Sequence, residues 1–338
     1  MHQGHTQERG GGRVTTETMV GRTGARTAHK ARTARPPSWQ TRQRRRLFWT
    51  FAAPWIMGTV LFTAFPLGLS LVLSFTQYYF SAPPTFAGVS NYTSLFTNPI
   101  FVHSVLITLL YTVVFVPIVT ALSLAIAMLV NGTSALKSVV KILVYAPTTI
   151  TGVVVGWLFL WVLNPTYGIL NSLLGAVGLG RPDWLLDPGW LMVGIIILSL
   201  WSSTGTNMVL FLAALQNVPT QLVEAARSDG AKALSVLQHV TLPILSPVTI
   251  FVVIISFIAS LQIFTPVYIM TGGGPNYASE FYVLYLYQTA FQTFAFGQAT
   301  AMSWLMLIAF SIITVVFFAY LSRRSYDAAS PLPEEMST

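Results

Sequence analysis

The sequence predicts an all-α polytopic membrane protein with six transmembrane helices. Of its 338 residues, 54% are hydrophobic and only 8% are charged, whereas soluble domains carry about 25% charged residues. The apolar residues gather in six runs, each long enough to cross a bilayer as a helix of about 20 residues. This composition excludes an ordinary soluble enzyme and a disordered chain. The absence of cysteine excludes disulfide frameworks and thiolate chemistry.

The predicted spans are almost free of charge. A charged side chain at the middle of a membrane helix costs about 2.5–3.5 kcal/mol on insertion scales. The one charged residue within the spans is Lys141, near the inner end of the third, where its long side chain can reach the surface. Lipid offers no hydrogen-bond partners, so each span satisfies its backbone only as a helix. The spans cover residues 47–75, 101–130, 139–163, 190–215, 244–270 and 299–321.

The basic residues predict the orientation and the domain boundaries. An even number of spans puts both termini on one side, and that side then holds every Lys and Arg except Arg181. The positive-inside rule places it in the cytoplasm. Residues 1–46 carry ten Arg and one Lys against two Glu, so we expect a disordered basic cytoplasmic tail beside the membrane lipid. A transmembrane domain at 47–324 and a cytoplasmic tail at 325–338 follow. Because the positive charge sits in the tail alone, it does not indicate nucleic-acid binding.

The cytoplasmic loop between the fourth and fifth spans predicts a short helix, a turn and a second short helix. Thr220 can cap the first helix, and Glu224 lies in its first turns, where a carboxylate favours the helix dipole. Asp229 and Gly230 are typical of a turn. The second helix is expected from about residue 231 until Pro243 disrupts it. The small residues of the first helix permit a partner to approach closely.

This loop resembles the signature of the membrane subunits of binding-protein-dependent ABC importers. That signature reads Glu-Ala-Ala, three residues, Gly, nine residues, Ile, one residue and Leu-Pro, and here Val240 stands at the Ile position. The resemblance extends over residues 47–324 and is similar to sugar-type, maltose-permease-like first subunits. The matching residues are Glu224, Ala225, Ala226, Gly230, Leu242 and Pro243, together with an outer-loop turn at Gly272, Gly273, Gly274 and Pro275.

The resemblance implies a division of labour between chains. The loop that includes Glu224, Ala225, Ala226, Asp229, Gly230, Leu242 and Pro243 would be a coupling helix that docks on an ATPase. No Lys in this chain follows a Gly, so the chain lacks the usual phosphate-binding loop. We therefore expect no cofactor, metal or catalytic residue here, and ATP and Mg on two partner ATPase subunits. A second similar permease and an extracytoplasmic solute-binding protein would complete the complex in a bacterial or archaeal cytoplasmic membrane.

Two polar clusters within the spans are candidates for a substrate pathway. Transport sites are lined by polar groups near the bilayer midplane, but Ser and Thr also hold helices together, and both interpretations stay open. Counted from Glu224 and from Gly274, the resemblance implies that most of these residues fall where maltose-type permeases contact sugar. The uncharged spans favour a neutral sugar over an anionic phosphate ester. The candidates are Ser202, Ser203, Thr206, Asn207, Ser256, Ser260 and Gln262.

Several alternatives compete with the sugar importer. Within the same class, a glycerol-phosphate-like solute is an alternative substrate. An ion-coupled secondary transporter would usually carry an acidic residue inside a span, and none does. An intramembrane enzyme would need catalytic groups close together, but His103 and His239 are predicted on opposite sides of the membrane. A scaffold protein is a further alternative. The aromatic run at 281–296 predicts a helix at the membrane interface, with sugar stacking as the second interpretation.

Overall fold

The structure is a computed structural model that describes residues 38–79 and 81–328, with side chains described within 46–316. The predicted tails therefore lie largely outside the described residues. The chain forms two units, one ending at Val60 and one beginning at Leu61. The described part of the first is α1 (Ser38–Thr59), which contains Pro54, together with Val60, where the π-helical turn that leads into the second unit begins. This helix begins before the boundary predicted at residue 47.

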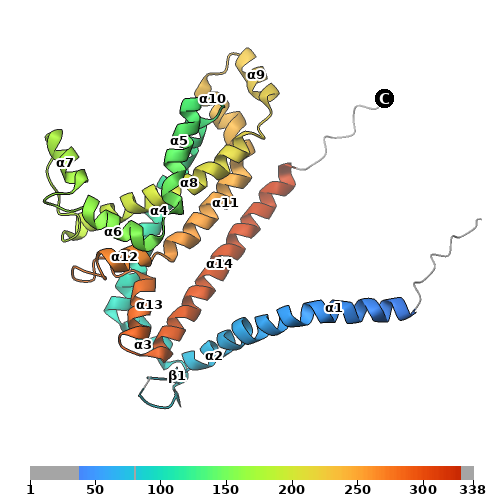
Figure 1. The fold of residues 1–338 in the computed structure, drawn as a ribbon, viewed down its shortest axis with the longest axis vertical. Coiled ribbons are helices and arrows are strands. Elements are labelled where there is room, and N and C mark those ends of the chain that lie inside the picture. The colour runs from blue at the N-terminus through green and yellow to red at the C-terminus, as the bar shows by residue number, and fades with distance from the viewer. Residues whose placement is uncertain (1–37, 80, 329–338) are drawn as a thin grey trace, which may run out of the picture. The chain divides into compact units, whose positions relative to one another are not determined.

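The second unit is almost entirely helical (Figure 1). A two-stranded antiparallel sheet near its start pairs Thr76 with Phe86. In chain order its elements are η1 (Val60–Ala64), α2 (Phe65–Ser74), β1 (Thr76–Gln77), β2 (Thr85–Phe86), α3 (Ser90–Thr97), α4 (Pro99–Val130), α5 (Ala135–Tyr145), η2 (Ala146–Thr149), α6 (Gly152–Val162), α7 (Ile169–Ala176), α8 (Pro188–Leu215), α9 (Thr220–Ser228), α10 (Ala233–Val236), η3 (Leu237–Thr241), α11 (Leu242–Leu261), α12 (Thr265–Met270), α13 (Tyr282–Phe291) and α14 (Phe296–Ala328).

Five helical segments of the described chain are long and apolar enough to cross a membrane, or six if one bent pair counts as a span. The bent pair lies where the third span was predicted at 139–163, and a proline within a span, here Pro147, predicts a kink. Between α5 and α6 the chain bends by 107°. Pro147 stands in the 3-10 turn between them, where it cannot donate a backbone hydrogen bond. The five segments are Arg46–Ser74, Pro99–Val130, Pro188–Leu215, Ala233–Met270 and Phe296–Val316.

The core of the second unit surrounds α4. This helix packs most extensively against α8 and then against α11, and the three run close together in Figure 1. One hydrophobic cluster joins Tyr111 and Val119 of α4 to Leu191 and Ile195 of α8. A second cluster, which includes Phe211, lies further along α8. The helices that carry the predicted polar clusters are therefore packed against one another.

Prolines in this chain do not always end helices. Each π-helical turn, η1 and η3, stands directly before an α-helix whose second residue is a proline, Pro66 or Pro243. A proline ring clashes with the carbonyl one turn earlier, and a wider turn relieves that clash. The prediction that Pro243 ends a short second helix is wrong, because the helix runs on from Ala233 into α11.

The outer-loop aromatics form a helix, α13, that lies partly inside the protein. It packs against α4 and α14. Tyr282 and Leu284 near its start are buried, whereas Phe291 at its end is 58% exposed. The aromatic run thus serves core packing in part, which its composition alone did not predict.

Candidate coupling loop, polar interior and outer turn

The helix α9 carries the predicted coupling residues and ends in a glycine-dependent cap. The Ala231 N–H donates to the Ala226 carbonyl at 3.0 Å and the Gly230 N–H donates to the Arg227 carbonyl at 3.0 Å. These are the two bonds of a Schellman motif. Gly230 has φ +82°, and a Cβ there would meet nothing within 4 Å. Backbone conformation, rather than space, therefore favours glycine at this position.

The start of α9 differs from the prediction. The cap position is Pro219 and makes no side-chain hydrogen bond, so Thr220 is the first helical residue and not the cap. Helix α9 contacts η3, which brings the Glu224–Gly230 segment near the turn before Leu242 and Pro243. The sequence signature is thus gathered at one end of the unit.

The surface of α9 is open. Glu224, Ala225 and Asp229 are exposed, and Ala226 is half-buried. Leu222 is 50% exposed and Leu234, on the neighbouring α10, is 64% exposed. Large exposed apolar side chains beside charged residues are typical of a surface that binds a protein partner.

Two hydrogen bonds between side chains connect the interior helices. The Asn207 amide of α8 donates to the Ser256 hydroxyl of α11 at 3.0 Å. The Ser260 hydroxyl of α11 donates to the Thr112 hydroxyl of α4 at 3.0 Å. All four residues are buried. In the chain by itself, Asn207, Ser256 and Ser260 therefore hold helices together.

The other pathway candidates do not join this network. Ser202 and Ser203 are half-buried, and the Ser202 hydroxyl donates to the Ser199 carbonyl at 3.2 Å. Thr206 is exposed on α8, and Gln262 is exposed at the C-cap of α11. The structure thus divides the candidates into buried bonding residues and residues available to a ligand or partner.

Sequence reasoning missed a polar stripe on α4. Its first three members are spaced by four residues, which places neighbouring members on one helix face, and the fourth follows eight residues later. Thr112 bonds Ser260, and the Thr108 hydroxyl accepts a bond from the Tyr282 N–H at 2.9 Å. The four-residue spacing inside an apolar span was the available signal. The stripe consists of Ser104, Thr108, Thr112 and Thr120, all buried.

A partly exposed group of aromatic rings lies where α11 gives way to α12. Phe264 and Tyr268 are nearly parallel, with ring centroids 5.5 Å apart. Tyr287 lies 5.1 Å from Phe264 and 5.2 Å from Phe291. The rings from α12 and α13 therefore form one cluster, which includes two of the predicted outer-loop aromatics.

The outer turn between α12 and α13 is tied to itself by side chains. Gly272 and Gly273 have φ +56° and +99°. The Ser279 hydroxyl donates to the Gly274 carbonyl at 2.8 Å and lies 2.7 Å from the Thr271 hydroxyl. The predicted turn at residues 272–275 is present, and its conformation depends on the residues that follow it.

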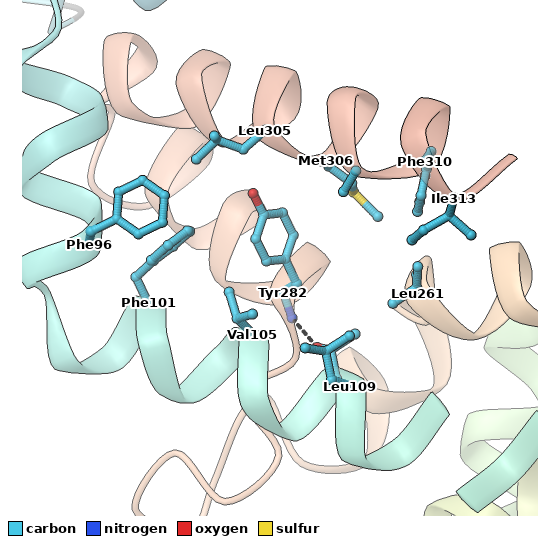
Figure 2. A pocket seen from close by; sticks show the side chains of 12 residues that line it. Phe96, Phe101, Val105, Leu109, Leu261, Tyr282, Leu305, Met306, Phe310 and Ile313 are labelled. Carbon is cyan, nitrogen blue, oxygen red and sulfur yellow. Dashed lines mark hydrogen bonds between the residues drawn. The ribbon is translucent and has the colours of Figure 1, made fainter. Parts of the chain in front are cut away.

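A cavity of about 210 Å³ lies between α4, α13 and α14 (Figure 2). Its walls are almost wholly apolar, and the Tyr282 ring projects into it. The Tyr282 hydroxyl already donates to the Met302 carbonyl at 2.7 Å, and its N–H is bonded to Thr108. A sugar needs several polar partners, so this cavity does not suit one.

No site for a metal ion emerges from the part of the chain that the structure describes, since no three His, Cys, Asp or Glu residues gather there. The long apolar helices, the exposed helical loop and the polar bonds between packed helices together define a multi-pass helical membrane protein.

A comparison with known protein families identifies the family to which this chain belongs. The model described as "Binding-protein-dependent transport system inner membrane component" matches residues 117–325. The chain belongs to this family, and the resemblance seen in the Glu224–Pro243 segment is confirmed. It is a multi-pass inner-membrane permease component of a binding-protein-dependent transport system, and a transport subunit rather than an enzyme. Membership in this family does not support the secondary transporter or scaffold alternatives.

Known proteins are similar over most of the chain. The probable ABC transporter permease protein YesP of Bacillus subtilis is 35% identical over 80% of this chain and 88% of its own length. The lactose transport system permease protein LacF of Rhizobium radiobacter is 33% identical over 82% of this chain and 94% of its own. A solved bacterial ABC transporter involved in the import of the acidic polysaccharide alginate has a chain of the same fold, with a TM-score of 0.73 and 23% identity. The match covers 85% of this chain and 98% of the transporter's chain.

Proposed function

We propose that this chain is the permease subunit of an ATP-driven importer for a neutral sugar or oligosaccharide. The observation that carries the proposal is the joint presence of an exposed α9 and an interior with polar but uncharged groups. The relative LacF is named for lactose transport, which supports a sugar as the substrate class. The alginate importer acts on an acidic polysaccharide, but no Lys or Arg lies in the packed part of α4, α8 or α11 to pair with such a charge.

The orientation proposed is six spans with both termini in the cytoplasm. In this arrangement the bent pair α5–α6 is one broken span, which agrees with the charge distribution of the inner and outer loops. Helix α9 then faces the cytoplasm and the turn at residues 272–275 faces outward.

The coupling mechanism follows from the geometry of α9. We propose that Glu224, Ala225 and Ala226 enter a cleft of a separate ATPase subunit, where the small alanines permit close approach. Gly230 fixes the end of the helix through the Schellman bonds. The continuous helix from Ala233 into α11 gives a rigid connection by which movement at α9 reaches Ser256 and Ser260.

The proposed complex contains this chain, one similar permease, two ATPase subunits with ATP and Mg, and a solute-binding protein. The substrate pathway lies between the two permeases and uses the more accessible Ser202, Ser203, Thr206 and Gln262. Asn207, Ser256 and Ser260 fix the helices that position them. The aromatic cluster around Tyr268 provides ring faces near Gln262, which suits a sugar.

The test is purification of this chain after mild detergent extraction, followed by reconstitution with the co-purifying proteins and a panel of neutral sugars and sugar acids. Recovery of an ATPase and a second permease, with ATP-dependent uptake of a neutral sugar, is the expected result. Loss of that recovery in Glu224→Lys and Gly230→Val supports the coupling role. Recovery of the chain alone, with solute flux in vesicles that lack ATP, contradicts the proposal. Uptake restricted to phosphorylated or acidic solutes contradicts the substrate class.

A further inference from the structure

The outer turn contains a buried carboxyl group that the transport mechanism above does not use. Glu280 is 1% exposed, and it is the only buried acidic or basic residue among the described side chains. Its Oε1 atom has no hydrogen-bond partner. Its Oε2 atom accepts a long bond of 3.4 Å from the Gln288 amide. A carboxylate in such surroundings loses its hydration without adequate replacement.

Glu280 lies directly against the glycine turn. A Cβ built at Gly273 would stand 1.9 Å from Oε2, so this side chain fits only because residue 273 has none. The Gln288 amide that contacts Glu280 also donates to the Gly272 carbonyl at 3.3 Å. The carboxyl group therefore lies between the backbone of the turn and a side chain of α13.

The charged and titratable groups around Glu280 supply no positive partner. On α4, His103 bonds the Tyr277 carbonyl at 2.9 Å, and Tyr111 packs on Phe281. Helix α14 carries no acidic or basic residue between 296 and 316. The other titratable groups on the turn and on α12 and α13 are all tyrosines, namely Tyr268, Tyr277, Tyr282, Tyr285 and Tyr287. Lys and Arg are absent from this part of the described chain.

In the absence of a cationic side chain, either of two ligands could compensate a buried carboxylate. One is a metal ion and the other is a proton. A hard cation such as Ca²⁺ takes six to eight oxygen ligands. Within the described residues no group of three or more His, Cys, Asp or Glu side chains that could hold a metal ion includes Glu280, and the close approach to Gly273 leaves little room there. A proton needs neither several oxygen ligands nor additional room. Burial raises the pKa of Glu280 to about 7, against the weaker opposing effect of the Gln288 bond.

We propose that Glu280 binds a proton when the 271–281 turn is closed, and that the neutral carboxyl group holds Gly273 against Gln288 as a proton-dependent latch. Opening of the turn returns the group to water, where it releases the proton. Low pH then favours the closed turn and rising pH favours the open one. The inference concerns the positioning of the turn and stands on its own geometry, whichever solute is imported.

The size of the effect follows from the two states of the carboxyl group. A Glu in water has a pKa of about 4.3, so the closed turn loses its proton-linked stabilisation between about pH 4.3 and 7. With a closed-state pKa of about 7, linkage predicts an increase of about tenfold in turn opening from pH 6 to 8, and a plateau above that.

The experiment is hydrogen exchange of amides in 271–281, measured by mass spectrometry on the purified transporter complex between pH 6 and 8. After correction for intrinsic exchange rates, the wild type is expected to lose about tenfold protection across this range. Glu280→Gln, which is neutral at every pH, should keep its protection constant. Asp183→Asn removes another outer-loop carboxyl group and should behave as the wild type. His103→Gln should also keep the wild-type dependence, which assigns the titration to Glu280.

A second measurement detects the proton itself. The infrared band of a protonated carboxyl group is expected in the wild type at pH 6, weaker at pH 8, and absent in Glu280→Gln. Both the hydrogen exchange and the infrared band can be measured on the wild type alone. The proposal can therefore be tested even if a variant fails to assemble. A protection factor that is constant with pH in the wild type overturns it. A pH dependence that persists in Glu280→Gln or disappears in His103→Gln also overturns it.

Discussion

The loop around α9 and the turn between α12 and α13 both reverse the chain at a glycine, but the surroundings of that glycine differ. Each connects helices and places a glycine at positive φ, Gly230 in one and Gly273 in the other. Around Gly230 there is open space and Glu224 is exposed. Around Gly273 a carboxyl group fills the space, and Glu280 is buried.

The different surroundings of Gly230 and Gly273 indicate different roles for the two loops. The exposed helix α9 caps its own C-terminal end through its backbone and leaves its charged side chains in solvent. The outer turn takes its shape from Ser279, Glu280 and Gln288 of its own chain. We therefore expect substitutions in the inner loop to affect function more than stability, and those in the outer turn to do the reverse.

The largest expected effect is at Glu224. Reversal of its charge in Glu224→Lys should leave the folded chain intact, because the side chain is exposed. An unmatched charge in a protein interface costs about 2–5 kcal/mol, so ATP-dependent uptake should fall by about 30-fold or more. Asp183→Lys, an equal charge change in the outer loop, is the control and should retain uptake. Normal uptake by Glu224→Lys would contradict the expectation that substitutions in the loop around α9 affect function.

The next effect is at Gly273. Gly273→Ala introduces a Cβ 1.9 Å from the Glu280 carboxyl group and should destabilise the unit by about 1–3 kcal/mol. The melting temperature of the purified complex measures it. Gly272→Ala tests positive φ without a clash, since its nearest neighbour is 4.0 Å away, and Gly274→Ala tests the position alone, with its nearest atom at 3.5 Å. Equal losses in all three variants would contradict the specific contact with Glu280.

A smaller effect is expected for the hydrogen bond between Asn207 of α8 and Ser256 of α11. A double-mutant cycle of Asn207→Ala and Ser256→Ala should give a coupling energy of about 0.6 kcal/mol and no more than about 1.7 kcal/mol, the mean and the maximum for hydrogen bonds between membrane helices. Denaturant titration of the complex measures it. A coupling near zero, together with a large loss of sugar affinity in Ser256→Ala, would indicate that Ser256 contacts substrate rather than Asn207.

Ser256→Leu and Ser260→Leu test the position of these residues relative to the pathway. Each places a larger side chain between packed helices, so uptake should fall while solute-stimulated ATP hydrolysis partly survives. Measurement of both activities in one preparation separates transport from coupling. If both activities stayed at wild-type levels, the proposed role of Ser256 and Ser260 in fixing the helices that position the pathway would be wrong.

The smallest effect concerns Lys141, which the sequence placed at the inner end of the third span. Its Nζ atom donates to the Gly132 carbonyl at 2.9 Å, just beyond the C-terminus of α4. A cation at this end of a helix stabilises it by about 0.3–1 kcal/mol. Lys141→Met should lower the melting temperature slightly and change uptake less than twofold, and Lys141→Arg should restore stability. A large uptake defect in Lys141→Met would indicate that this part of the inner surface also contacts a partner.

Features that depend on neighbours in the chain could be predicted. The apolar runs mark the membrane helices because charge is costly in lipid. The Asp229-Gly230 pair predicts the turn because few residues other than glycine adopt positive φ. The spacing from Glu224 to Pro243 carries the family. At Pro147 the chain bends, as a proline within a span predicts. At Pro243 the local rule failed, because a proline can either break a helix or be accommodated by a wider turn, and the surrounding helices decide between these outcomes.

The sequence by itself therefore determined that the protein lies in a membrane, that an exposed helix follows Pro219, and to which family the chain belongs, since each depends on composition or on short spacings. Only the tertiary structure decided that Ser260 meets Thr112 and that Glu280 lies on Gly273. Thr112 and Ser260 are 148 residues apart in the chain. No local pattern specifies which helix faces which, because packing of whole helices sets those contacts.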